Sequence, residues 1–296
     1  MRLIKPFPVT GSVLASSNVP ESEYPVWSST LTFSLGDRVI DSSVHRIYES
    51  LVNSNSNLLP STHPTSWVEV GPTNRWAMFD DEIGTTTSLS GPITVVLTPE
   101  SPATALALLG VTGHSVSVSM VWEGTTVYDT VIPLTDVNNN SDWYSYFYEG
   151  TVARTSVVLM DLPSYSGAEI HISVEAFAAG SAIGMCLIGT SKNFGITQYG
   201  ASMSIDDYSK KDRDEFGRVT ITPREYSKKG RFSFEVPHNQ YDTVFQYLAS
   251  VRSSRVLYVG TDSFESTLIY GFYKSFDAVI PYPTYSVYNL EIEGLI

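Results

Sequence analysis

Cysteine is almost missing from this sequence, in which Cys186 is the single one among 296 residues. One cysteine cannot form a disulfide within the chain, and no zinc or iron–sulfur site can be built from thiolates. Its flanking residues are apolar, so we expect Cys186 to be a small buried hydrophobic side chain. Nothing in the sequence indicates a cofactor.

Charged side chains are also scarce, at 17% of the residues, and they sum to a net charge of −13. This acidic balance argues against a nucleic-acid-binding protein, because phosphates need Lys and Arg partners. The charge is unevenly distributed. The first 190 residues hold six basic and eighteen acidic side chains, whereas the remainder hold twelve and thirteen. The shift predicts a domain boundary near residue 190.

Long hydrophobic runs are absent as well. No stretch approaches the roughly 20 apolar residues of a membrane helix. The first eleven residues carry charge but lack the apolar segment of a secretion signal. We therefore expect no membrane insertion, and we expect a protein that is made in a cytoplasm and reaches its site by assembly or lysis.

Motifs of known enzymes are missing too. The sequence has no HExxH, no nucleophile elbow and no phosphate-binding glycine loop, and its histidines stand singly in different segments: His45, His63, His114, His171 and His238. Two local patterns have simpler interpretations. Asp80-Asp81-Glu82 could supply the paired carboxylates of a glycan hydrolase, but a solvated acidic loop is the simpler interpretation. Asp136 to Asp142 alternates oxygen ligands like a calcium loop, yet Phe147 stands where the closing glutamate belongs. We predict no catalytic residue, no metal site and no enzyme.

What the sequence does hold is β-forming residues. Hydrophobic residues make up 42% of the chain, and 18 tyrosines dominate its aromatic content, which favours a mainly β protein with large contact surfaces. Residues 1–29 hold several prolines and predict an extended arm, lying along the molecule or on a neighbouring subunit. Residues 30–81 predict a small three-stranded module. Residues 82–194 predict a β-sandwich, jelly-roll or galactose-binding-like, because alternating runs such as Ser115–Val121 are separated by turn residues.

Residues 195–296 predict an α+β half-barrel with one helix. A charged turn from Asp206 to Gly217 is expected to precede its strands. The helix is predicted at about 237–252, where Pro237 suits the first turn. Its apolar stripe has helical spacing and consists of Tyr241, Val244, Phe245, Leu248 and Val251.

The small module has a recognisable order of residues. An aromatic residue precedes a Gly-Asp turn, a valine, a strand tyrosine, a loop with Asn and Pro, and a Trp-x-x-Val run: Phe33, Gly36, Asp37, Val39, Tyr48, Asn55, Pro60, Trp67 and Val70. This order resembles a small chitin-binding-type carbohydrate-binding module. Sugar rings could stack on Tyr48, Trp67 or Trp76, although Tyr48 and Trp67 could equally be the core of so small a module.

Two further runs carry a second resemblance. Gly71–Asp80 and Tyr270–Leu295 resemble segments of tail-tip or baseplate proteins of long-tailed bacteriophages, and a β-barrel with one helix is similar to the ring-forming domain of distal-tail and minor tail proteins. The resemblance implies a structural virion protein in the phage tail, assembled in the host cytoplasm, that joins the tail tube to the hub and fibres. The implied partners are copies of itself in a threefold or sixfold ring, those tail proteins, and a host surface glycan.

Two groups of residues are candidates for the subunit interface. One is the aromatic cluster Trp143, Tyr144 and Tyr146. The other is the basic set Arg224, Lys228 and Lys229, which would meet the acidic block of residues 206–215 on a neighbouring subunit. Two solvated loops are the simpler alternative for these charges. A glycan-binding adhesin of the tail is the alternative function, and a glycan hydrolase is a third.

Overall fold

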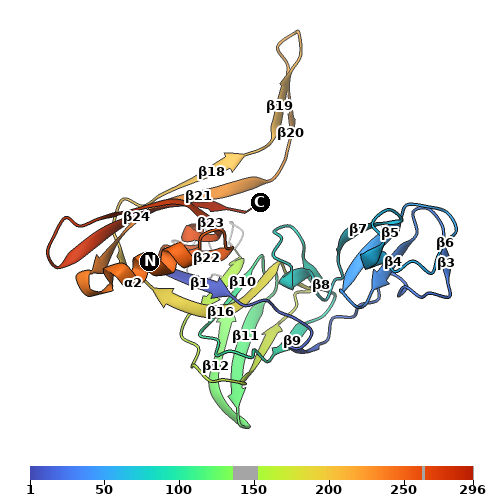
Figure 1. Ribbon diagram of the computed structural model, residues 1–296, viewed down its shortest axis with the longest axis horizontal. Helices are drawn as coiled ribbons and strands as arrows, with labels where there is room; N and C mark the ends of the chain where they lie inside the picture. The colour runs from blue at the N-terminus through green and yellow to red at the C-terminus, as the bar shows by residue number, and fades with distance from the viewer. Residues whose placement is uncertain (136–152, 262–263, 296) are drawn as a thin grey trace. The chain divides into compact units, whose positions relative to one another are not determined.

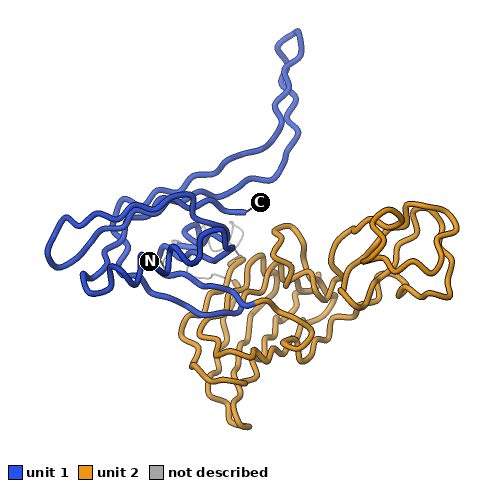
Figure 2. The backbone as a smooth tube through the Cα atoms, in the orientation of Figure 1, with its two compact units in different colours: residues 1–7, 188–296 blue, residues 8–187 orange. Residues whose placement is uncertain are grey.

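The structure is a computed structural model that describes residues 1–135, 153–261 and 264–295. It is mainly β, with 51% of the residues in strands and 8% in helices, which confirms the predicted fold class. The chain forms two compact units (Figure 2). Residues 8–187 make up one, here called the inserted unit. Residues 1–7 and 188–296 make up the other, here called the terminal unit.

The inserted unit contains the small module. β4 (Arg38–Asp41), β5 (Arg46–Ser50) and β7 (Trp67–Pro72) form its antiparallel sheet, as the sequence predicted. Short pieces complete the module: β3 (Thr32–Phe33), β6 (Asn55–Ser56), and the 3-10 turns η1 (Pro60–Thr62) and η2 (Ala77–Phe79).

The Gly-Asp turn of the module follows from backbone chemistry. Gly36 adopts φ +88°, which is accessible to glycine at little cost. The Asp37 carboxylate then accepts a hydrogen bond from the Ser34 N–H at 2.6 Å. These two residues therefore fix the direction in which β4 leaves the turn.

The larger part of the inserted unit is a set of antiparallel strands. β2 (Leu14–Ser17), β9 (Ile93–Leu97), β11 (Ser115–Trp122), β12 (Thr125–Pro133) and β14 (Glu169–Val174) form a five-stranded sheet in the order β12-β11-β14-β9-β2. Val116, Val118 and Met120 are fully buried while the residues between them are partly exposed, which is the alternation predicted for β11.

The remaining strands of this unit lie outside the five-stranded sheet. β10 (Ala105–Leu109) lies between β13 (Ser156–Leu159) and β16 (Met185–Asn193). β8 (Thr87–Leu89) pairs with β15 (Ser181–Ile183). The strands of the predicted sandwich therefore belong to the five-stranded sheet, to a two-stranded sheet, and to a ten-stranded sheet that continues through β16 into the terminal unit.

The terminal unit is a curled antiparallel sheet with one α-helix (Figure 1). Its strands run in the order β16-β1-β22-β23-β24-β21, and both β17 and β18 pair with β21. The bounds are β1 (Arg2–Pro6), β17 (Ile196–Thr197), β18 (Ser202–Asp207), β19 (Lys210–Arg213), β20 (Val219–Thr222), β21 (Tyr226–Pro237), β22 (Val256–Val259), β23 (Leu268–Val279) and β24 (Tyr285–Gly294). The 3-10 turns η4 (His238–Gln240) and η5 (Glu265–Thr267) precede the helix and β23.

The α-helix α2 (Tyr241–Ser250) lies close to its predicted position. Val244, Leu248 and Val251 of the predicted stripe are buried in the core of the unit, whereas Phe245 is largely exposed and contacts the Phe276 ring edge-on. Two strand tyrosines hold the helix ends. The Tyr288 hydroxyl donates to the Tyr241 carbonyl at 2.9 Å, and the Tyr273 hydroxyl donates to the Leu248 carbonyl at 3.0 Å. Among the described residues no helix has the length and apolar character to cross a membrane.

The expected segment boundaries differ from the compact units in two places. The first residues do form an extended segment, but β1 pairs with β16 and β22 while β2 pairs with β9, so the segment belongs to both units. β16 continues through the boundary at residues 187 and 188. The change in charge near residue 190 therefore lies close to the boundary, although the strand itself is unbroken.

Candidate functional site

Two of the three predicted sugar-stacking residues are core residues. Trp67 is 2% exposed and Tyr48 is 8% exposed, and both pack with Phe33 and Val39 in the core of the small module. The Trp67 indole N–H donates to the Leu58 carbonyl at 2.9 Å, and its ring meets Phe33 edge-on at 5.4 Å. This corrects the sugar-stacking interpretation for Tyr48 and Trp67, because neither presents a ring face to solvent.

Trp76, the third candidate, is half-buried against a histidine. Its ring stacks on the His45 imidazole, with centroids 4.4 Å apart and planes inclined by 20°. His45 is held in turn by Glu21, whose carboxylate lies 3.0 Å from His45 Nδ1 and 3.5 Å from the Arg75 guanidinium. Glu21 also accepts a hydrogen bond from the Thr73 hydroxyl at 2.7 Å. The Glu21 carboxylate therefore connects its own segment to the one that holds His45 and to the one that holds Thr73 and Arg75.

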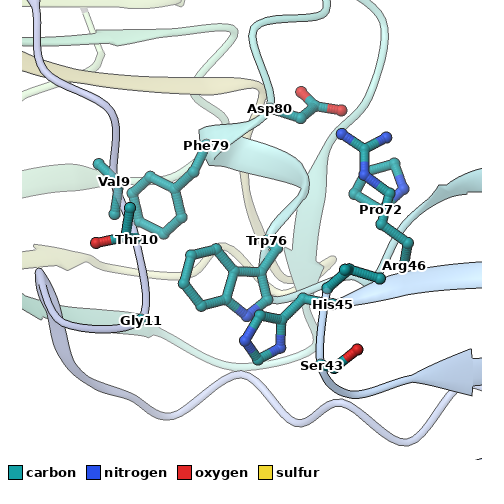
Figure 3. A pocket seen from close by; sticks show the side chains of 11 residues that line it. Val9, Thr10, Gly11, Ser43, His45, Arg46, Pro72, Trp76, Phe79 and Asp80 are labelled. Atoms are coloured by element: carbon teal, nitrogen blue, oxygen red, sulfur yellow. The ribbon is translucent and has the colours of Figure 1, made fainter. Parts of the chain in front are cut away.

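His45 and Trp76 line a cavity of about 270 Å³ within the inserted unit. Figure 3 shows the Trp76 ring between His45 and Phe79, with Val9 and Thr10 of a neighbouring segment beside the Phe79 ring. The wall is mixed in character, since aromatic rings alternate with hydroxyl, imidazole and guanidinium groups. A small ligand with apolar faces and several hydroxyl groups matches such a wall.

Asp80 lies at the edge of the same cavity and is only 9% exposed. Burial raises the pKa of this carboxyl group, although a hydrogen bond from the Thr85 hydroxyl at 2.8 Å opposes the rise. The next two residues, Asp81 and Glu82, are exposed. Among the described residues, Asp80 is the one acidic residue that lines the cavity, so the described part of this wall does not hold the pair of carboxyl groups that glycoside hydrolysis requires.

Metal ligation finds no support in the part of the chain that the structure describes. Residues 1–135, 153–261 and 264–295 contain no group of three His, Cys, Asp or Glu side chains placed to hold an ion. Cys186 is buried as expected, and burial raises the pKa of its thiol to about 12. The calcium-like pattern from Asp136 to Asp142 lies outside the described residues.

A second candidate site is a long β-ribbon in the terminal unit. β18 and β21 form its base, and β19 and β20 continue past them as a two-stranded extension (Figure 1). All residues of β19 and β20 are exposed. The ribbon and the segment leading into it carry an unusual number of exposed large apolar side chains: Ile196, Tyr199, Ile205, Tyr208, Phe216, Val219, Ile221 and Tyr226.

The charged side chains of the ribbon pair within the chain. Lys229 contacts Asp206, Lys211 lies 3.1 Å from Asp207, and Lys210 lies 2.7 Å from Asp212. Hydrogen bonds from Ser209 and then Lys211 lower the pKa of Asp207 to about 2. The expected pairing of a basic block with an acidic block between subunits is therefore corrected for Lys229, whose acidic partner is on the adjacent strand of its own chain.

The other predicted interface residues have mixed outcomes. Arg224 and Lys228 are exposed on the ribbon. The Trp143, Tyr144 and Tyr146 cluster lies outside the described residues. Sequence reasoning missed the apolar ribbon surface itself. A signal for it was present in β20, where Val219 and Ile221 alternate with threonine. The strand that precedes it in the sequence, β19, is wholly charged and offers no apolar side chain to pack against them.

The chain was also compared with known proteins. The search of protein-family models finds no match to this sequence, and no curated protein matches it either.

Proposed function

We propose that this chain is a structural virion protein, a subunit of a ring at the tail tip or baseplate of a long-tailed bacteriophage. One observation carries the proposal. The terminal unit extends a two-stranded ribbon whose apolar side chains are exposed, with Phe216 at its tip 90% exposed. Such a surface is typical of a protein that functions as part of an assembly.

The two-stranded end of the ribbon has no covering surface of its own. A two-stranded hairpin without a packed face is marginally stable in water, so it needs a third strand or a covering surface. β19 and β20 bury none of their residues. Long exposed strand edges also promote pairing with other chains. A neighbouring subunit in a closed ring would cover the ribbon and remove its free edges at once.

The remaining parts of the proposal derive from the sequence resemblance. The ring would hold three or six copies in the phage tail, formed in the host cytoplasm, and would join the tube to the hub and fibres. The inserted unit would project from it and is the part available to a host surface glycan.

The test is the mass and symmetry of the purified full-length chain, measured by mass photometry and negative-stain electron microscopy. We expect closed rings. A variant in which residues 210–222 are replaced by a short Gly-Ser turn should be monomeric, with unchanged secondary structure in the rest of the chain. A full-length chain that stays monomeric at every soluble concentration would contradict the proposal.

The alternative of a glycan-binding adhesin is favoured by one observation, the Trp76 cavity. Saturation-transfer NMR with host-envelope oligosaccharides tests it directly. Trp76→Ala should abolish the transfer, whereas Trp122→Ala should not. Trp122 is a matched control, because it is also half-buried and stacks on an aromatic ring, Tyr165, at 4.8 Å. Equal transfer to the wild-type chain and the Trp76→Ala variant would exclude this cavity as the binding site.

A further inference from the structure

A groove lies at the base of the ribbon. It has a volume of about 270 Å³ and is lined by residues of β18, β21 and η5: Met203, Ser204, Ile205, Tyr226, Lys228 and Ser266. Ile205 faces Lys228 directly across the strand pair, so an apolar side chain and a cation share one face. Ile205 is 62% exposed, and the groove is open and predominantly apolar.

The tip of the ribbon has the complementary chemistry. The Asp214 carboxylate accepts hydrogen bonds from the N–H groups of Phe216 and Arg218, at 3.0 and 2.7 Å, so the turn is internally fixed. Gly217 completes it with φ +82°. This fixed turn presents Glu215 and Phe216 outward, and both are exposed. An anion and a phenyl ring therefore stand side by side at the tip.

The tip and the groove belong to one ribbon but cannot meet within one chain. Ile205 and Phe216 are eleven positions apart in a nearly extended chain, a span of roughly 35 Å at about 3.3 Å per residue. Two ends of one ribbon are thus available to different molecules. The groove is large enough for the ring, because a cavity of about 150 Å³ suffices to bind benzene.

We propose that the ribbon tip of one copy docks into the ribbon-base groove of the next copy, with Phe216 in the groove and Glu215 paired with Lys228. The inference rests on the proposed ring function and specifies its contact. The contact is heterologous, because each copy offers its tip to one neighbour and its groove to the other. Contacts of this type close into rings when the rotation between copies permits.

A charge-reversal cycle tests the pairing. Glu215→Lys and Lys228→Glu are made singly and together in the full-length chain, and self-association is measured by analytical ultracentrifugation. Each single reversal should raise the apparent Kd at least about tenfold, since it places like charges in contact. The double variant should return to within about threefold of the wild-type value. Lys274→Glu, an exposed lysine on β23, is the matched control and should leave the Kd unchanged.

Phe216→Ala supplies an independent arm. Because Phe216 would be an aromatic anchor in a pocket, its truncation to alanine should weaken self-association by about thirtyfold. Phe216 is exposed in the isolated chain, so the variant should fold normally, and circular dichroism checks this. Unchanged association in both single reversals and in Phe216→Ala would overturn the docking proposal while leaving a ring intact. A wild-type chain without self-association would overturn the proposed function instead.

Discussion

Trp67 should be indispensable to the small module, and replacing it by alanine tests why. The side chain is buried in a cluster of four residues with Trp27 packed against it, and its N–H satisfies the Leu58 carbonyl. Truncating a buried Trp costs about 3–5 kcal/mol. A module of about 50 residues has roughly 3–8 kcal/mol of stability in all. Trp67→Ala should therefore unfold this module or leave it barely folded, without unfolding the terminal unit.

Hydrogen exchange measured by mass spectrometry resolves the effect by segment. Amides of β4, β5 and β7 should lose protection in Trp67→Ala, while those of β23 and β24 keep it. Val68→Ala is the matched control, because the neighbouring valine is in the same strand with its side chain largely exposed, and it should change stability by less than about 1 kcal/mol. Full protection of the module in Trp67→Ala would refute the assignment of this ring to the core.

Three further predictions follow from the same structure. Gly271→Ala should lower the melting temperature of the terminal unit, because an added Cβ would lie 2.1 Å from the Glu293 carbonyl oxygen. Ser275→Ala, on the same strand, is the control and should leave the melting temperature unchanged. An unchanged melting curve for Gly271→Ala would contradict the close approach. Burial and the hydrogen bond to Asp161 raise the pKa of Tyr128 to about 12, so the contribution of Tyr128 to stability is present below about pH 10 and declines as the pH rises toward 12. The titration of Tyr128 is measured as the difference in absorbance at 295 nm between the wild-type chain and Tyr128→Phe. A midpoint near the ordinary tyrosine pKa would refute the prediction. The Cys186 thiol should react with a disulfide reagent only as the chain unfolds, since burial raises its pKa to about 12, and rapid labelling under native conditions would disprove it.

The small module was largely predictable because its signals are local. A Gly-Asp turn, a tight hairpin and an alternating strand are each encoded within a few residues, and β4, β5 and β7 lie where these signals indicate. The same residues could not tell a core aromatic from a sugar platform. That choice depends on how Phe33, Val39 and the Trp67 ring come together, which is a tertiary property.

The helix shows where a local signal was incomplete. Its stripe was predicted, yet Pro237 ends β21, paired with Tyr285, and does not open the helix. A proline at the end of a strand loses no ladder hydrogen bond, so both positions suit it. β19 was predicted as part of a charged turn, because its four residues, Lys-Lys-Asp-Arg, are all charged and none is an apolar residue of the kind that indicates a strand. β19 is a strand because its backbone pairs with β20, a contact that its composition does not indicate.

The first strand could not be assigned to a sheet from sequence. Arg2 pairs with Asn193 and also with Val259, and no local pattern identifies partners so distant along the chain. The Trp76 cavity was missed as a cavity for the same reason. It combines His45, Asp80 and residues near Thr10. The sequence singled out Trp76 and Asp80 separately, and nothing local indicated that they line one cavity.

The position of β1 between β16 and β22 has a consequence for biosynthesis. β1 is made long before β22, one of its two neighbours in the sheet, so the two strands can pair only after residues 256–259 have been synthesised. The inserted unit can fold during that interval. Pairing of β1 with β22 therefore joins the two parts of the terminal unit's sequence after the inserted unit between them has been made.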